Sequence, residues 1–156
     1  MGEEEGTASS GLDPDKGGTE AALLPVKGQR MFTWAEPGEW ITDSAQHLSY
    51  CWSELGVDDQ GASTTVMVVR YEPGSEVRPH YHDLDYCSIV VEGAIEVTRQ
   101  HHGVGSMRLV KAGTAYGPLR AGPDGCTVID VFATGQGDST KKMGITYLTP
   151  RSARNT

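Results

Sequence analysis

Hydrophobic and β-branched residues come in short runs along the central part of the chain, and Gly, Pro, Asn or Asp residues separate many of them. Runs of about four to eight such residues, some of them alternating apolar and polar side chains, predict β-strands. The runs lie at residues 64–71, 86–91, 94–100, 107–111, 126–133 and 144–148. The turns between them recur at the spacing of a sandwich or barrel, so the pattern predicts an all-β domain.

Two segments between these runs are interpreted as turns. Glu92–Gly93 lies between 86–91 and 94–100 and predicts a tight turn that joins them into a hairpin. Residues 115–125 (AYGPLRAGPDG) predict two turns around Arg120 at the mouth of a barrel.

The run at 126–133 has two faces, and the pattern does not decide which one points inward. One face carries Cys126, Val128, Asp130 and Phe132, and the other carries Thr127, Ile129 and Val131. Both faces contain apolar residues, so periodicity alone leaves the choice open.

Composition supports one domain with two tails. The chain has 156 residues with 20 Gly and 8 Pro, which suits many short strands joined by turns. We expect an acidic disordered tail at 1–27, a single domain at 28–150 and a frayed tail at 151–156. No apolar run is long enough to cross a bilayer and no secretory signal is recognisable, so a cytoplasmic protein is expected.

The net charge of −8 is concentrated at the N-terminus. Residues 1–20 carry six acidic residues and one lysine, or −5, so the rest of the chain carries only −3. Nucleic-acid binding needs a basic patch, and the sequence offers none. The expected partner is therefore a small-molecule substrate, with neither nucleic acid nor membrane involved.

His80 and His82 are the first candidates for chemistry. They lie two residues apart on a segment predicted to be extended, so both imidazoles point to one face. Two neutral imidazoles on one face are a natural start for a transition-metal site.

The spacing around this pair resembles the first motif of the cupin superfamily. Gly74, His80, His82 and Gly93 stand in register with that motif, and Tyr86 occupies the position of its glutamate ligand. The second motif is degraded. Its register falls on Gly105, Lys111 in place of proline, Gly113, Tyr116 in place of histidine and Arg120 in place of asparagine.

This resemblance, which covers about residues 60–135, implies a double-stranded β-helix, the jelly-roll-like cupin barrel, and a homodimer. It also implies a site in which tyrosines replace two of the four usual metal ligands. In one interpretation His80, His82, Tyr86 and Tyr116 all bind a metal, with Fe first and Zn, Mn, Ni or Cu as alternatives. In a second, the histidines hold the metal and a tyrosine acts as acid or base. In a third no metal binds, and His and Tyr act as acid–base groups.

The first functional hypothesis is a metal-dependent oxygenase acting on an aromatic or polyketide-like substrate, with Tyr86, Tyr116 and Arg120 as catalytic or orienting residues. The alternative is a cyclase, isomerase or lyase that uses Tyr and His acid–base chemistry. A third hypothesis is a non-catalytic ligand-binding barrel. The remaining polar residues near the motifs, Asp83, Asp85, His101 and His102, are expected to face solvent.

Overall fold

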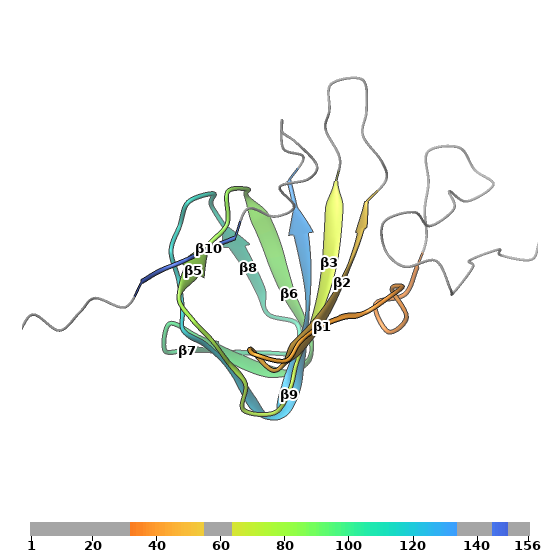
Figure 1. Ribbon diagram of the computed structural model, residues 1–156, viewed down its shortest axis with the longest axis horizontal. Coiled ribbons are helices and arrows are strands. Elements are labelled where there is room, and N and C mark those ends of the chain that lie inside the picture. The colour runs from red at the N-terminus through yellow and green to blue at the C-terminus, as the bar shows by residue number, and fades with distance from the viewer. Residues whose placement is uncertain (1–31, 55–63, 134–144, 150–156) are drawn as a thin grey trace, which may run out of the picture.

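The computed structural model describes residues 32–54, 64–133 and 145–149 and is all-β over these ranges, as the sequence predicts (Figure 1). The described residues contain no helix, and so none that could span a membrane. The expected tails at 1–27 and 151–156 lie outside them. The strands are β1 (Ile41–Asp43), β2 (Leu48–Glu54), β3 (Thr65–Tyr71), β4 (Glu76–Val77), β5 (His80–Tyr81), β6 (Tyr86–Val97), β7 (Gln100–Gly103), β8 (Met107–Val110), β9 (Leu119–Phe132) and β10 (Thr146–Tyr147).

All strand pairs are antiparallel and follow the order β1-β2-β3-β9-β6-β7, with β4 also on β9 and β8 also on β6. The long strands β6 and β9 run side by side and bend together near the lower end in Figure 1. Their upper halves form one wall with β8, β3, β2 and β1, and their lower halves form a second wall with β7 and β4. A separate pair, β5 and β10, lies beside these walls.

The bend of β6 lies at Glu92–Gly93, where the sequence pattern predicts a hairpin turn. That prediction is wrong: β6 continues through both residues, with register shifts against β9 on either side of them. Gly93 has a φ of +66°, and a side chain there would overlap the carbonyl oxygen of Gly125 on β9. The glycine is therefore needed for a bulge and a close strand crossing. The hairpin turn falls instead at Thr98–Arg99, where both residues have positive φ.

The two turns predicted at 115–125 are also wrong in part, because Leu119 already begins β9. Residues 119–121 pair with the lower half of β6, and Leu119 and Arg120 also pair with β4. Pairing on both sides holds this Gly- and Pro-containing segment extended.

Further along β9, Val128 and Asp130 face the interior cavity, which settles the choice of face that the sequence leaves open.

The buried core lies between the two walls. Its apolar residues come from almost every strand of the barrel and include Phe132, which is completely buried. The core cluster consists of Leu48, Met67, Val69, Val77, Tyr86, Val90, Ile95, Val97, Val110, Leu119, Ala121, Cys126, Val128 and Phe132. Many of these side chains also line a cavity, so the barrel is hollow rather than filled.

Candidate functional site

A cavity of about 640 Å³ opens between the walls. This is the size of many small-molecule sites, and such sites combine apolar walls with a few convergent polar groups. The apolar lining includes Trp52, Val69, Val90, Ile95 and Val128. The polar lining consists of Asp43, Gln46, Tyr50, Tyr71, His80, His82, Asp83, Ser88, His102, Ser106, Arg108, Tyr116, Asp130, Thr146 and Tyr147.

The four residues predicted from the motifs come together: His80, His82 and Tyr116 line this cavity, and Tyr86 lies in the wall next to them. His80 lies on β5, His82 directly after it, Tyr86 at the start of β6, and Tyr116 in the segment before β9. The ring centroids of His80 and Tyr116 are 4.7 Å apart, and those of His82 and Tyr86 are 5.1 Å apart. The backbone of His80 forms a two-way bridge with Tyr116, which fixes the segment that carries the second tyrosine.

His80 is held in one tautomer. Its Nδ1 lies 2.8 Å from the carbonyl oxygen of Arg78. A carbonyl can only accept, so Nδ1 carries the hydrogen and Nε2 keeps its lone pair in the neutral ring. Burial lowers the pKa of His80 to about 4, and the neighbouring His82 contributes in the same direction. The imidazole is therefore neutral at physiological pH.

The hydroxyl groups of Tyr86 and Tyr116 are hydrogen-bonded to each other, and Tyr86 is the donor. The guanidinium of Arg108, on β8, lies 4.4 Å from the ring centroid of Tyr116 and 3.5 Å from the Tyr86 hydroxyl. Burial raises the pKa of Tyr116, and the hydrogen bond from Tyr86 and the charge of Arg108 oppose part of that rise. Tyr116 lines the cavity, whereas Tyr86 does not line it and is buried in the upper wall at the start of β6.

Asp130 and Arg108 face the cavity from the same row of the upper wall. Strand register places Asp130 opposite Ser88, and Ser88 opposite Arg108, so the three cross β9, β6 and β8 in order. Burial raises the pKa of Asp130 to about 6, while a hydrogen bond from Ser88 and the charge of Arg108 oppose the rise. The sequence pattern does not identify either Arg108 or Asp130 as a site residue.

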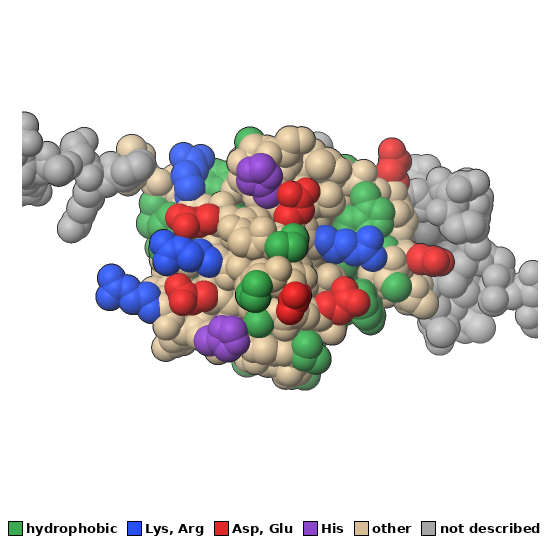
Figure 2. Space-filling model, turned by 90° about the horizontal axis from the view of Figure 1, so that it is seen from below, with side chains coloured by type: hydrophobic (Ala, Val, Ile, Leu, Met, Phe, Trp, Pro, Cys, Tyr) green, Lys and Arg blue, Asp and Glu red, His purple; other side chains and the backbone are tan. Residues whose placement is uncertain are grey.

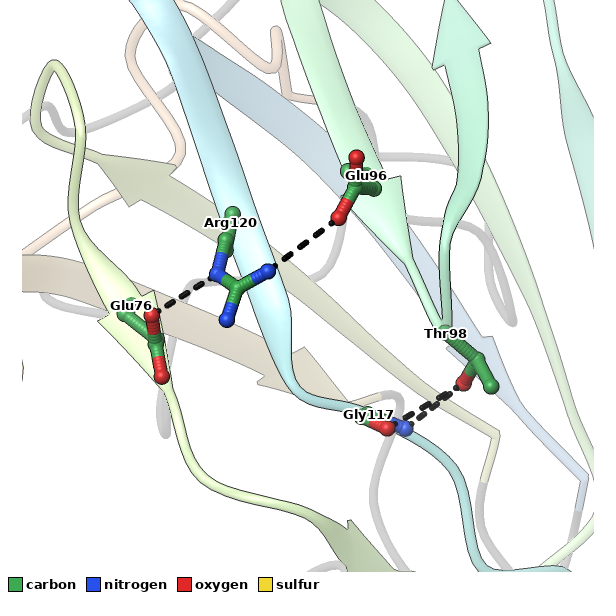
Figure 3. Close-up of polar contacts among 5 residues, drawn as sticks. All are labelled: Glu76, Glu96, Thr98, Gly117 and Arg120. Carbon is green, nitrogen blue, oxygen red and sulfur yellow. Dashed lines mark hydrogen bonds and ion pairs between the residues drawn. The ribbon is translucent and has the colours of Figure 1, made fainter.

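Arg120, expected from the sequence to orient the substrate at the barrel mouth, does not line the cavity. Its guanidinium lies on the outside between Glu76 and Glu96, at 2.8 Å and 3.4 Å, and its side chain is 52% exposed (Figure 3). In this part of β9 the outward parity falls on Arg120, because Leu119 and Ala121 are buried. Seen from below, this end of the molecule shows acidic and basic side chains next to one another (Figure 2). The arginine that lines the cavity is Arg108, on β8.

Of the other polar residues near the motifs, Asp85 and His101 lie outside the cavity, and Asp83 and His102 line it. Asp85 is tied to Lys111 and to the backbone amide of Ala112, outside the cavity. His101 is exposed, as expected. Asp83 is exposed but lines the cavity. His102 departs from the expectation: it lines the cavity from β7, and its Nε2 is buried with no hydrogen-bond partner among the described residues.

Residues 145–147 complete the site from the C-terminal side. Tyr147 pairs with His80 through the β5–β10 ladder, and the two ring centroids are 5.7 Å apart. Its hydroxyl accepts a hydrogen bond of 2.8 Å from the side-chain amide of Gln46, which follows β1. The sequence pattern predicts a strand at 144–148 but gives no sign that it covers the histidine pair.

The donor set can be tested against the metal that the motif resemblance implies. Over the described ranges, no three His, Cys, Asp or Glu side chains are arranged to hold a metal ion. The two phenols that replace the missing ligands are hydrogen-bonded to each other, and the Arg108 cation lies against both. A second cation at the same oxygens would be repelled by this arginine. These residues therefore do not fit a four-ligand metal centre.

Comparison with known proteins defines the class of fold. No family model matches the chain, and no curated protein matches it in sequence. A search of solved structures finds many similar chains. One is an RmlC-like cupin from Shewanella frigidimarina, with 22% identity, a TM-score of 0.52 and coverage of 71% of this chain and 96% of that one.

Two further matches are enzymes. The polyketide cyclase RemF from Streptomyces resistomycificus has 15% identity and a TM-score of 0.50, with 67% of this chain and 72% of that one covered. Oxalate decarboxylase from Bacillus subtilis, described by its Mn(II) centres, has 15% identity and a TM-score of 0.51, with 61% and 27% covered. This protein has the cupin fold, the jelly-roll barrel that the first motif predicts.

Proposed function

We propose that this protein is a small-molecule enzyme that moves protons on a carbonyl-bearing substrate, as a cyclase, isomerase or lyase does. The observation that carries the proposal is the hydrogen-bonded series Arg108, Tyr86 and Tyr116, which ends at the cavity. Tyr86 donates to Tyr116, so the proton of Tyr116 is left to point at a ligand. Tyr116 is therefore the acid, and Tyr86 and Arg108 stabilise the phenolate that forms.

The neutral imidazole of His80 supplies the opposite function. Nε2 of His80 holds a lone pair, and its ring lies 4.7 Å from that of Tyr116. In the proposed step the imidazole removes a proton from the carbon next to the substrate carbonyl. The C–H electron pair forms the C=C bond of an enol, and the carbonyl oxygen takes the proton of Tyr116. The imidazolium and phenolate that result have opposite charges, which offsets the cost of burying each one.

The likeness to RemF supports this assignment at the level of fold only, because the identity is 15%. The apolar body of the cavity suits an aromatic or polyketide-like substrate, in line with the expectation from the sequence.

Proton exchange gives a test that does not depend on the identity of the natural substrate. The chain is incubated in D₂O at neutral pH with a panel of cyclic ketones and aryl ketones, whose uncatalysed exchange is slow, and loss of the α-proton signal is followed by NMR. We expect catalysed exchange that survives dialysis against a chelator and is lost in Tyr116→Phe. Absence of catalysed exchange across the panel, or full exchange by the variant, counts against the proposal.

A metal-dependent oxygenase is the second candidate, favoured by one observation. The Nδ1–H of His80 bonded to a backbone carbonyl is the arrangement that orients a metal-ligating imidazole. His80 and His82 would hold the metal, with Fe first and Zn, Mn, Ni or Cu as alternatives, and the metal would supply Lewis-acid or redox chemistry. Metal analysis of the aerobically purified protein, with His80→Ala as the comparison, tests it, because this candidate requires a metal that depends on the histidines. Exchange activity that disappears with the metal would favour this candidate over the first.

A further inference from the structure

We propose that Asp130 is a further substrate-binding residue and that, with Arg108, it selects cyclic substrates carrying a hydroxyl group as well as an acidic oxygen. The inference rests on the proposed function in one respect: the acidic oxygen is taken to bind beside Tyr116 and Arg108. The role of Asp130 is additional and follows from its own surroundings.

Asp130 is a buried carboxyl group with an unused acceptor. Its side chain lines the cavity, the residue is 6% exposed, and its Oδ1 has no hydrogen-bond partner among the described residues. Ser88 donates to the same carboxyl group and so accounts for only part of its capacity. Buried polar atoms are nearly always paired, so an orphaned carboxyl oxygen facing a cavity indicates a partner that arrives with the ligand.

The neighbouring arginine does not supply that partner. Arg108 lies two strands away in the same row and directs its guanidinium to the hydroxyl of Tyr86 and the ring of Tyr116. None of the ion pairs found over the described ranges joins it to Asp130. The row therefore presents a cation at one end and an acceptor at the other, with the Ser88 hydroxyl between them.

This polarity defines a class of ligand. An acidic oxygen, such as a carboxylate or enolate, fits the arginine end, and a hydrogen-bond donor fits Asp130. Neighbouring strands lie about 4.8 Å apart, so one small ring can reach both ends of a row that crosses three strands. The next row contributes Val69, Val90 and Val128, which are apolar and suit the ring itself. The ligand is a hydroxylated cyclic acid rather than a plain aromatic acid.

Benzoate and 3-hydroxybenzoate form a matched pair of probes, because they differ only in the hydroxyl group. Titration calorimetry, with NMR for weak complexes, would give both dissociation constants for the full chain. We expect 3-hydroxybenzoate to bind about tenfold more tightly than benzoate, as a hydrogen bond to a buried charged group allows. Asp130→Ala should abolish this preference while keeping benzoate affinity. Asp130→Asn, which keeps an acceptor without the charge, should retain part of it.

Asp124→Ala is the control, because Asp124 lies on the same strand but is exposed and outside the cavity. It should keep the full preference. A wild-type protein without hydroxyl preference overturns the proposal, as does a preference that survives in Asp130→Ala. Benzoate binding that depends on Arg108 would, in that case, leave the proposed function intact. If, in contrast, the wild-type protein does not catalyse proton exchange on ketones, the proposed function is wrong, but the preference for 3-hydroxybenzoate can still be measured.

Discussion

The hydroxyl groups of Tyr86 and Tyr116, thirty residues apart in the chain, are hydrogen-bonded to each other at the positions where the two motifs have a glutamate and a histidine. Tyr86 is buried and Tyr116 is partly buried, and the charge of Arg108 lies beside both. The two replacements are thus complementary. One phenol alone would leave a buried hydroxyl in need of a partner, and the second phenol provides it.

The two tyrosines should differ in their effect on proton exchange. Only Tyr116 lines the cavity, so Tyr116→Phe should lower the exchange rate by on the order of 10²-fold or more, as loss of a general acid does. Tyr86→Phe removes the hydrogen bonds of Tyr86 to Tyr116 and Arg108 but leaves the acid itself in place, and it should cost about tenfold. NMR exchange rates measure both, and melting temperatures show whether the rings still pack. Equal losses in the two variants would contradict these roles.

Replacement of Asp130 by Asn should make the ligand-free protein more stable above pH 6. The folded-state pKa of about 6 lies above the ordinary value, so the native state binds this proton more tightly than the unfolded state does. The contribution of Asp130 to stability therefore falls as pH rises from about 4 to 6, by up to about 3 kcal/mol. Urea denaturation at pH 4 and pH 7.5 compares the two proteins.

The advantage of Asp130→Asn should be largest at pH 7.5 and should shrink toward pH 4. His80, whose pKa is lowered to about 4, titrates in both proteins and cancels in the difference. A variant that is less stable at every pH would show that Asp130 serves the fold rather than a ligand.

Arg108 and Arg120 form a matched pair of substitutions inside and outside the barrel. Arg108→Met leaves the buried phenols without their charged neighbour and should destabilise the protein by about 1–3 kcal/mol. Arg120→Met removes two exposed ion pairs and should cost less than Arg108→Met does, and less still in 0.5 M salt, which screens exposed charges. Denaturation at low and high salt checks both. A strong salt dependence confined to the Arg108 variant would reverse this assignment.

Gly93 should be less replaceable than Gly105, although both have a positive φ. A methyl group at Gly93 would overlap the backbone of Gly125, so Gly93→Ala should prevent folding or cost several kcal/mol. Gly105 also has a positive φ, but its surroundings are open, so Gly105→Ala should cost only about 1–2 kcal/mol. Soluble yield and melting temperature separate the two, and similar values for both variants would contradict the close crossing.

The fold and the central four residues could be predicted from the sequence because both depend on local signals. Strand runs and turn spacing indicate the all-β class, and motif spacing places His80, His82, Tyr86 and Tyr116 together. The prediction fails where pairing across the sheet overrides local preference. Glu92–Gly93 looks like a turn in isolation, but the neighbouring β9 draws it into a bulge.

Arg108 illustrates the second kind of failure. It lies between Met107 and Leu109, which are 70% and 84% exposed, while the arginine faces the cavity. An amphipathic strand normally buries its apolar side, so the alternation predicts the opposite orientation. The inversion is visible only once register fixes Arg108 opposite Ser88. An arginine flanked by apolar residues on a short strand is the one local signal that could have pointed to it.

The shared strands of the two walls have a mechanical consequence. Because β6 and β9 belong to both walls, the barrel cannot part like a clamshell without breaking their long ladder. In contrast, β10 is held by a two-residue ladder with β5 and by the hydrogen bond from Gln46 to Tyr147, which are far fewer interactions than those between β6 and β9. Amide hydrogens of β10 should therefore exchange long before those of β9. Solutes then enter and leave the cavity past β10, which has the fewest hydrogen bonds. The long ladder between β6 and β9 keeps the shape of the cavity fixed.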